Sequence, residues 1–343
     1  MRKRLFTILQ YFGFLAVGIF LVWWQFTSMS EEAKAEFYLA LRQANYWLLI
    51  PVIIMSLASH LSRSMRWKLL MEPLDYDPKL KNVFAVTMVG YLVNAAVPRL
   101  GEIVKCSFLA RYEKLKVDKL VGTIIVERTF DVVCYIIFIA VTILIQIDVI
   151  GGAVKEKLKA ITASPGFPLW AKVLIVFFVI LLLLFLIKYF FKKYPENKLI
   201  NKINSFLKGI IEGFKSIEHL KHKRAFILHT IFIWAMYLLQ IYVGFYAMEG
   251  TAHLSLKAAF SVLTLATLAM IATPGGIGSF PIFVMQTLLL YGIAAPLGQA
   301  FGSLIWGVST AIVLVAGLLA LLFIPYINRK KHEISSIDPG ENI

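Results

Sequence analysis

The sequence from Ala258 to Asn328 contains no Asp, Glu, Lys or Arg. This stretch is far too long for one membrane crossing, because about 20 apolar residues already span the ~30 Å hydrocarbon core of a bilayer. Proline and glycine interrupt it, most densely at Pro274–Gly278, so we expect several helical pieces and not a single helix. The stretch therefore predicts a polytopic, all-α membrane protein.

Composition agrees with this prediction and explains the charge of the chain. Apolar residues make up 59% and charged residues 16% of the sequence, whereas soluble domains are about 45–50% apolar and ~25% charged. The net charge of +15 could indicate nucleic acid, but most Lys and Arg residues lie between the apolar runs. We therefore interpret the excess as a topology signal and a contact with anionic lipid, and we expect no nucleic-acid partner.

The sequence contains only two cysteines, Cys106 and Cys134. Neither has the spacing of a zinc site, and two cysteines exclude a disulfide-stapled scaffold. We expect no metal site and no cofactor.

Apolar runs predict about six full spans and two shorter elements. The full spans are expected at about 5–27, 44–62, 120–146, 169–191, 225–248 and 296–325. Basic residues accumulate on the cytoplasmic side of membranes, and here they cluster at the N-terminus, after the second span and at the C-terminus. Both termini are therefore predicted to be cytoplasmic.

The two shorter elements are predicted to be re-entrant hairpins. Both flanks of 83–110 are basic, so this piece should enter and leave on the same side, with Pro98 and Gly101 forming its turn. The second piece, 257–293, has arms of only about 15 residues on either side of a turn at Pro274, which is short for spanning helices. Two short spans remain the alternative for this second piece.

The predicted elements recur along the chain. The span at 44–62, the first hairpin and the span at 120–146 are followed by equivalents about 175–180 residues later, and the two hairpins enter from opposite sides. This order predicts an inverted repeat within one membrane domain (1–343), with halves 1–150 and 151–328 and a short cytoplasmic tail at 329–343. A coincidence among uncertain segment edges is the alternative.

Charged residues inside membrane segments mark function, because each costs about 2.5–3.5 kcal/mol at the bilayer centre. Arg99, Glu102 and Lys105 lie at and just after the first turn, while Glu127, Arg128 and Asp131 share one helix face. The site is expected at these six charged residues, and we predict that Arg99, Glu102, Glu127, Arg128 and Asp131 bind the anionic headgroup of a lipid. The structural alternative is an ion-pair cluster, with Arg99 paired to Glu127 or Asp131 and Glu102 paired to Arg128.

The second turn offers a different kind of anion site. The backbone N–H groups of Gly275, Gly276 and Gly278 are predicted to contact the same headgroup, as glycine-rich turns do with phosphate. The alternative is a tight turn that simply requires glycine.

Three polar residues near the end of the second span receive a structural interpretation. Arg63 and Arg66 are typical of cytoplasmic anchors that follow the positive-inside rule. His60 is interpreted as a packed or snorkelling histidine.

Three motifs resemble the signatures of one family in order and spacing: Val97–Glu102, Glu127–Asp131 and Thr273–Gly278. The family is the lysylphosphatidylglycerol synthase transmembrane region, or flippase-like domain, family of polytopic membrane proteins. The resemblance covers essentially the whole chain. It implies lipid handling in a bacterial-type cytoplasmic (inner) membrane.

Some members of this family carry a soluble aminoacyl transferase domain, and others stand alone. Only about 18 residues follow the last predicted span, so lysyl transfer is not expected of this chain. The leading prediction is a flippase-like transporter of a phospholipid or lipid-linked sugar headgroup, without direct use of ATP because no GxxxxGK[ST] motif is present.

Two other functions stay open from the sequence. One is an integral-membrane enzyme that modifies a headgroup at the cytoplasmic face, using Glu102, Glu127 and Asp131 as acid/base groups or metal ligands. The other is a membrane subunit that does not transport. Membrane lipids are the expected partners, with a homo-oligomer or a partner membrane protein left open.

Overall fold

We describe the protein from a computed structural model, which covers residues 16–146 and 220–335. The predicted span at 169–191 lies outside these residues, as does most of the first half of the span at 5–27. The chain divides into two compact units, Met1–Arg128 with His219–Ile343, and Thr129–Glu218. Nearly everything below concerns the first unit.

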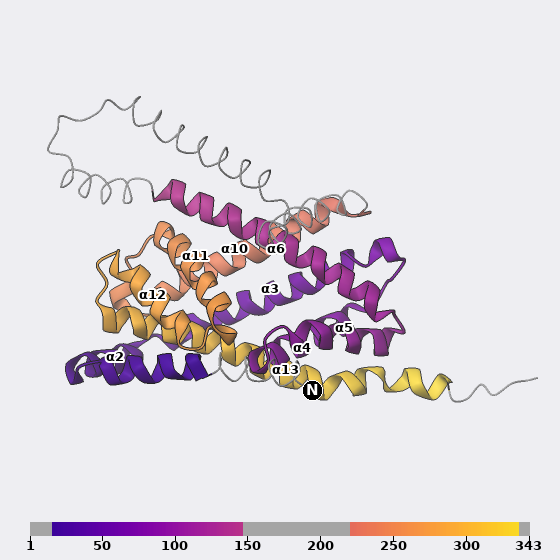
Figure 1. The fold of residues 1–343 in the computed structure, drawn as a ribbon, viewed down its shortest axis with the longest axis horizontal. Helices are drawn as coiled ribbons and strands as arrows, with labels where there is room; N and C mark the ends of the chain where they lie inside the picture. Colours follow the sequence, from indigo (N-terminus) through magenta and orange to yellow (C-terminus); the bar gives the residue numbers. More distant parts are fainter. Residues whose placement is uncertain (1–15, 147–219, 336–343) are drawn as a thin grey trace, which may run out of the picture. The chain divides into compact units, whose positions relative to one another are not determined.

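The described part of the chain is helical, which confirms the all-α fold class (Figure 1). A helical stretch at Ala16–Ser28 comes first. The helices that follow are α2 (Glu31–Gln43), α3 (Leu49–Leu69), α4 (Leu80–Ala96), α5 (Leu100–Glu113), α6 (Val117–Ile145), α10 (Lys223–Phe245), α11 (Leu256–Ala272), α12 (Ser279–Leu289) and α13 (Ala295–Ser335). Short 3₁₀ turns connect several of them, among them η3 (Glu249–Thr251) and η4 (Pro274–Gly276).

Four described segments are long and apolar enough to cross a bilayer. They are Tyr46–Leu74, Val117–Ile145, Lys223–Phe245 and Ala295–Arg329. These correspond to the predicted spans at 44–62, 120–146, 225–248 and 296–325. The chain is an integral membrane protein.

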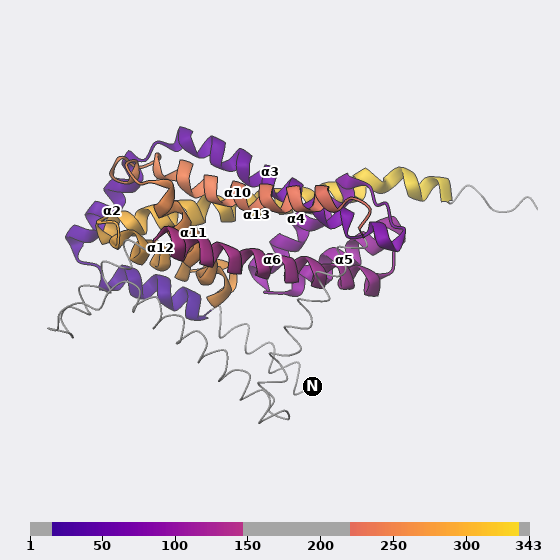
Figure 2. The same cartoon turned by 90° about the horizontal axis from the view of Figure 1, so that it is seen from above.

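Helices α3 and α10 lie side by side and antiparallel (Figures 1 and 2). The backbone N–H of Asn45, just before α3, donates to the carbonyl of Ala247, just after α10, at 2.8 Å. Nearer the other end, Ser62 Oγ lies 2.9 Å from His229 Nδ1. Small buried residues such as Ser59 on α3 allow close helix approach, which is how helices associate in lipid.

The first hairpin, α4–α5, begins and ends at the same end of the unit. Asn82 near the start of α4 donates to Glu113 at the end of α5 and forms a reciprocal amide pair with Asn328 of α13, with both bonds at 3.0 Å. A hydrogen bond between His222 Nδ1 and the carboxylate of Glu72, at 3.0 Å, joins the start of α10 to the segment after α3. We call this the basic end, because the predicted cytoplasmic loops meet here.

The second hairpin, α11–α12, begins and ends at the opposite end. Helix α11 follows η3, and Gly250 of η3 contacts Leu297 in the first turn of α13 so closely that an added Cβ would collide with it. The Asn45–Ala247 bond lies at this end too. The two hairpins therefore point toward each other, and η4 at the tip of the second packs against α4 of the first.

Side chains at the basic end form the apolar core around α4 and α5. Its largest members are Trp67, Met71, Leu109, Leu120 and Ile324. Because they come from α3, α5, α6 and α13, this core fixes the positions of the helices that carry the charged residues described next.

Candidate functional site

The tip of the first hairpin exposes Arg99. This residue is the N-cap of α5 and has left-handed backbone angles, with φ 68°, which is uncommon for a residue other than glycine. The turn is closed behind it, because the N–H of Gly101 donates to Asn94 Oδ1 at 2.8 Å and Gly101 contacts the carbonyl of Gly90. Pro98 and Gly101 thus lie in the turn, and Arg99 is presented at its apex.

Glu127 of α6 lies at the centre of a buried charge cluster. Its carboxylate is within ion-pair distance of three cations: Arg66 at 3.5 Å, Lys105 at 3.3 Å and Arg128 at 3.4 Å. Arg66 also donates to Thr230 Oγ1 on α10, at 3.3 Å. Four helices, α3, α5, α6 and α10, therefore meet at one carboxylate.

Aromatic rings hold the buried cations in place. The ammonium of Lys105 lies 4.3 Å from the centroid of the Trp67 ring, and the Arg66 guanidinium lies 5.7 Å from that of Phe226. Such contacts contribute about 2 kcal/mol or more where the cation is desolvated. Trp67 is itself fixed by a hydrogen bond to Thr123 Oγ1, at 2.8 Å. The two buried cations therefore each contact an aromatic ring as well as the carboxylate of Glu127.

The cluster is closed on one side and open on the other. Side-chain exposure is 0% for Arg66 and Glu127 and 3% for Lys105. It rises to 38% for Arg128 and 32% for Glu102, which pair at 3.0 Å. The accessible side is therefore the side on which α5 begins.

Positive charge is in excess in this cluster. Arg66, Lys105 and Arg128 pair with the carboxylates of Glu102 and Glu127, so three cations face two carboxylates. Arg99, exposed at the hairpin tip, adds a further positive charge to the first unit. Asp131 lies one turn beyond Glu127 on α6, in the second unit.

The turn of the second hairpin uses most of its backbone groups internally. Gly275, Gly276 and Gly278 all have positive φ, which explains the glycines. The carbonyl of Gly275 accepts from Trp306 Nε1 at 2.8 Å, and that of Gly278 accepts from Gln25 Nε2 at 2.7 Å. The N–H of Gly276 bonds within the turn. Anion binding by these glycines stays a prediction.

The geometry changes two interpretations made from the sequence. The Glu102–Arg128 pair is present, but Glu127 pairs with Arg66 and Lys105 and not with Arg99. The interpretation of Arg66 as a surface anchor is wrong, since its side chain is fully buried. Lys105 was expected with the charges after the first turn, whereas Arg66 was missed as a cluster member; its three-residue spacing from Arg63 is the signal that could have identified it.

Metal binding finds no support among the residues that the structure describes. No group of three or more His, Cys, Asp and Glu side chains lies close enough to hold an ion. The carboxylates of Glu102 and Glu127 instead pair with arginine and lysine side chains.

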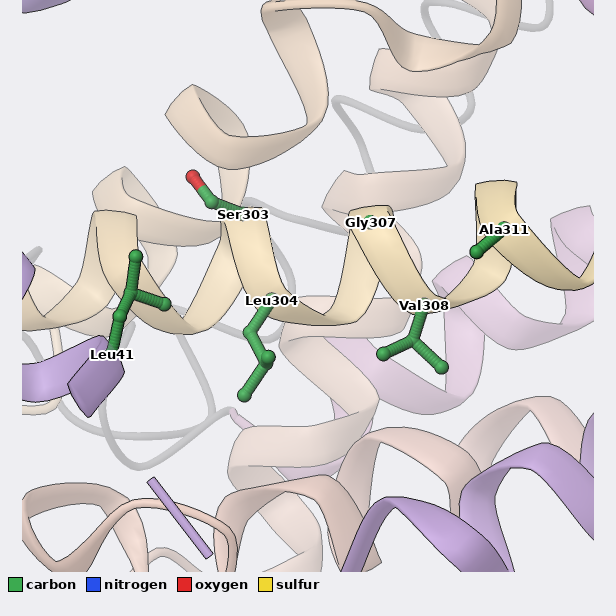
Figure 3. Close-up of a pocket in the computed structure, with 6 residues that line it drawn as sticks. All are labelled: Leu41, Ser303, Leu304, Gly307, Val308 and Ala311. Atoms are coloured by element: carbon green, nitrogen blue, oxygen red, sulfur yellow. The ribbon is translucent and has the colours of Figure 1, made fainter. Parts of the chain in front are cut away.

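A separate apolar groove lies along α13, facing Leu41 of α2 (Figure 3). Its volume is about 360 Å³, and Leu304 and Val308 project into it from the same side of the helix. Ile324 of the basic-end core is 16 residues further along α13 than Val308, or about 24 Å at 1.5 Å per residue. The groove is therefore not part of the charged site.

Comparison with known proteins agrees with the architecture. Residues 12–317 match the family described as the lysylphosphatidylglycerol synthase TM region. The chain is also 23% identical over 290 residues to a UPF0104 membrane protein of Methanocaldococcus jannaschii, covering 78% of this chain and 82% of the relative. No solved structure gives a significant match. Because the family match covers most of its length, the chain belongs to the lysylphosphatidylglycerol synthase TM region family.

Proposed function

We propose that this protein is a flippase-like lipid transporter that moves an anionic phospholipid or lipid-linked sugar headgroup between the leaflets of a bacterial-type cytoplasmic (inner) membrane. The observation that carries the proposal is the positive excess of the charge cluster around Glu127. Charges inside a membrane protein are normally paired, so the surplus cations favour an anionic ligand that arrives from the membrane.

The route of the headgroup follows α5. Arg99, Glu102 and Lys105 are spaced three residues apart, so each lies about 4.5 Å further along the helix. An exposed arginine at a hairpin tip can bind the headgroup phosphate first. Arg128 can then exchange its pairing with Glu102 for a pairing with the phosphate, since this pair is the partly exposed one.

Two symmetrical access routes are part of the proposal. Equivalent helices of an inverted repeat must run antiparallel. Helices α3 and α10, which would be equivalent, run antiparallel. Helices α10, α11, α12 and α13 begin 174, 176, 179 and 178 residues after α3, α4, α5 and α6. The hairpins, proposed to be re-entrant, would then alternate in opening the site to each leaflet, and Gly275, Gly276 and Gly278 would contact the headgroup from the second hairpin.

Reconstitution in vesicles tests the proposal. The purified chain is expected to move a fluorescent phospholipid with an anionic headgroup across the bilayer without ATP and to leave it chemically unchanged. Arg99→Ala and Arg128→Ala should each reduce the rate at least tenfold at equal folded yield. Arg111→Ala is the matched control, because this exposed arginine is also on α5 but lies at its far end. Absence of transport by the wild-type chain for every anionic probe would overturn the proposal.

A further inference from the structure

Two polar side chains meet in the interior of the first unit, and each has a buried polar atom that forms no hydrogen bond with the described residues. The rings of His60 on α3 and Tyr91 on α4 lie 5.0 Å apart at an interplanar angle of 49°. His60 Nδ1 and the Tyr91 hydroxyl are both buried, and neither has a hydrogen-bond partner among the residues that the structure describes. The two groups therefore do not bond to each other either.

Such an arrangement is costly in an empty protein. A buried polar group without a partner destabilises by about 1–3 kcal/mol, and most buried polar groups in proteins have one. Other tyrosine and tryptophan side chains of the first unit are paired, as Trp67 is with Thr123 and Tyr291 with Ser261. Two unpaired groups side by side thus point to a ligand that supplies the missing bonds.

The pair continues the charged site toward the middle of the membrane. His60, Arg63 and Arg66 are spaced three residues apart on α3, and Arg66 is the completely buried arginine that pairs with Glu127. The Arg63 guanidinium lies 6.0 Å from the centroid of the Tyr237 ring. His60 is nine residues before the end of α3, which corresponds to a depth of about 14 Å, close to the centre of a ~30 Å hydrocarbon core.

We propose that His60 and Tyr91 form a binding subsite for a hydroxyl group of the transported headgroup. A hydroxyl both donates and accepts, so it can accept from the tyrosine O–H and donate to the imidazole nitrogen at the same time. The neighbouring arginines take the phosphate. That the ligand is a lipid rests on the proposed function, whereas the recognition of a hydroxyl rests on these two side chains.

The test compares two lipids that differ only in hydroxyl groups. Affinities of the purified full chain are measured for short-chain phosphatidylglycerol and for phosphatidylpropanol, which lacks both headgroup hydroxyls. The wild-type chain is expected to bind phosphatidylglycerol about tenfold more tightly, as one or two net hydrogen bonds provide. Tyr91→Phe, which removes only an oxygen, should reduce this ratio to about threefold or less, and the double variant His60→Phe/Tyr91→Phe should abolish it.

A stability measurement separates recognition from folding. Tyr91→Phe removes no bond from the empty protein, so its melting temperature without lipid should equal or exceed that of the wild type. Tyr291→Phe is the matched control: it loses the bond to Ser261, so it should melt lower and keep the tenfold ratio.

Three results would overturn the subsite. The first is equal affinity of the wild-type chain for the two lipids, which would mean that the pair holds only water. The second is binding of neither lipid, and the third is a Tyr91→Phe variant that discriminates between the lipids as the wild type does. A tenfold binding ratio without transport in vesicles would instead overturn the proposed function and leave the subsite standing.

Discussion

The carboxylate of Glu127 and the guanidinium of Arg66 pair at 3.5 Å between two side chains that are both completely buried. They lie 61 residues apart in the chain, on α6 and α3. Taking both charges out of water carries a large desolvation penalty, which their attraction offsets only when further partners are present. Lys105 and Thr230 supply these partners. The pair therefore joins four helices at the base of the proposed lipid site.

Removal of the central carboxylate should destabilise the protein. Glu127→Gln leaves Arg66 and Lys105 buried without their counter-charge, and breaking a buried pair in this way costs about 3–5 kcal/mol. We expect a much lower folded yield and melting temperature in detergent, measured by size-exclusion chromatography after heating.

Asp77→Asn provides the control for Glu127→Gln. Asp77 also pairs with a lysine, Lys68 at 2.8 Å, but its side chain is 89% exposed, so the change should cost less than about 1 kcal/mol. If the two variants melted at the same temperature, Glu127 would not be a buried structural centre.

The sequence predicted where charge enters the membrane better than it predicted how deeply each charge is buried. Glu102 and Arg128 were identified because charges in apolar runs stand out, and their pairing is observed. Arg66 has the same local pattern as a surface anchor, because it follows an apolar run and precedes basic residues. Only packing against α10 and α6, far away in sequence, distinguishes a buried arginine from an exposed one.

The same limit applies to the hairpins. The basic flanks of 83–110 indicated that the start of α4 and the end of α5 lie at the same end of the unit, and Asn82 does contact Glu113 there. Charge patterns report on which side a segment begins and ends. The hydrogen bonds of the backbone in the second turn could not be predicted from the charge pattern. The donors to the carbonyls of Gly275 and Gly278 come from Trp306 and Gln25, which are distant in the chain.

Close backbone approach in the first hairpin should make Gly101 intolerant of any side chain. A Cβ at this position would collide with the carbonyl of Gly90, and the hairpin would have to open. Gly101→Ala is expected to destabilise by about 1–3 kcal/mol, as overpacking does, and to reduce the yield of folded protein. Gly122→Ala, on α6, has no atom within 4 Å of the new methyl group and should be neutral or slightly stabilising. Equal effects of the two changes would contradict the close contact.

Arg99 should show a conflict between stability and function. Its left-handed backbone costs about 1 kcal/mol or more for a residue with a Cβ, and glycine adopts it without this cost. Arg99→Gly is therefore expected to leave the melting temperature unchanged or raise it slightly, while lipid transport falls as strongly as in Arg99→Ala. A variant that transports normally would show that the arginine is present for reasons other than headgroup binding.

The directions of the two hairpins can be tested by the accessibility of introduced cysteines. Lys81 and Lys116 flank the first hairpin and Ser255 and Leu290 flank the second, and all four are exposed. In a background without the native cysteines, Lys81→Cys and Lys116→Cys should both react with a membrane-impermeant maleimide only from the cytoplasmic side. Ser255→Cys and Leu290→Cys should both react only from the opposite side. A hairpin that crossed the membrane twice would give the same labelling at its two flanks. Its tip would then be exposed on the far side of the membrane. Labelling of Arg99→Cys at the tip of the first hairpin therefore distinguishes the two arrangements. Labelling of Arg99→Cys as rapidly from the outside as Leu290→Cys would show that the first hairpin is not re-entrant.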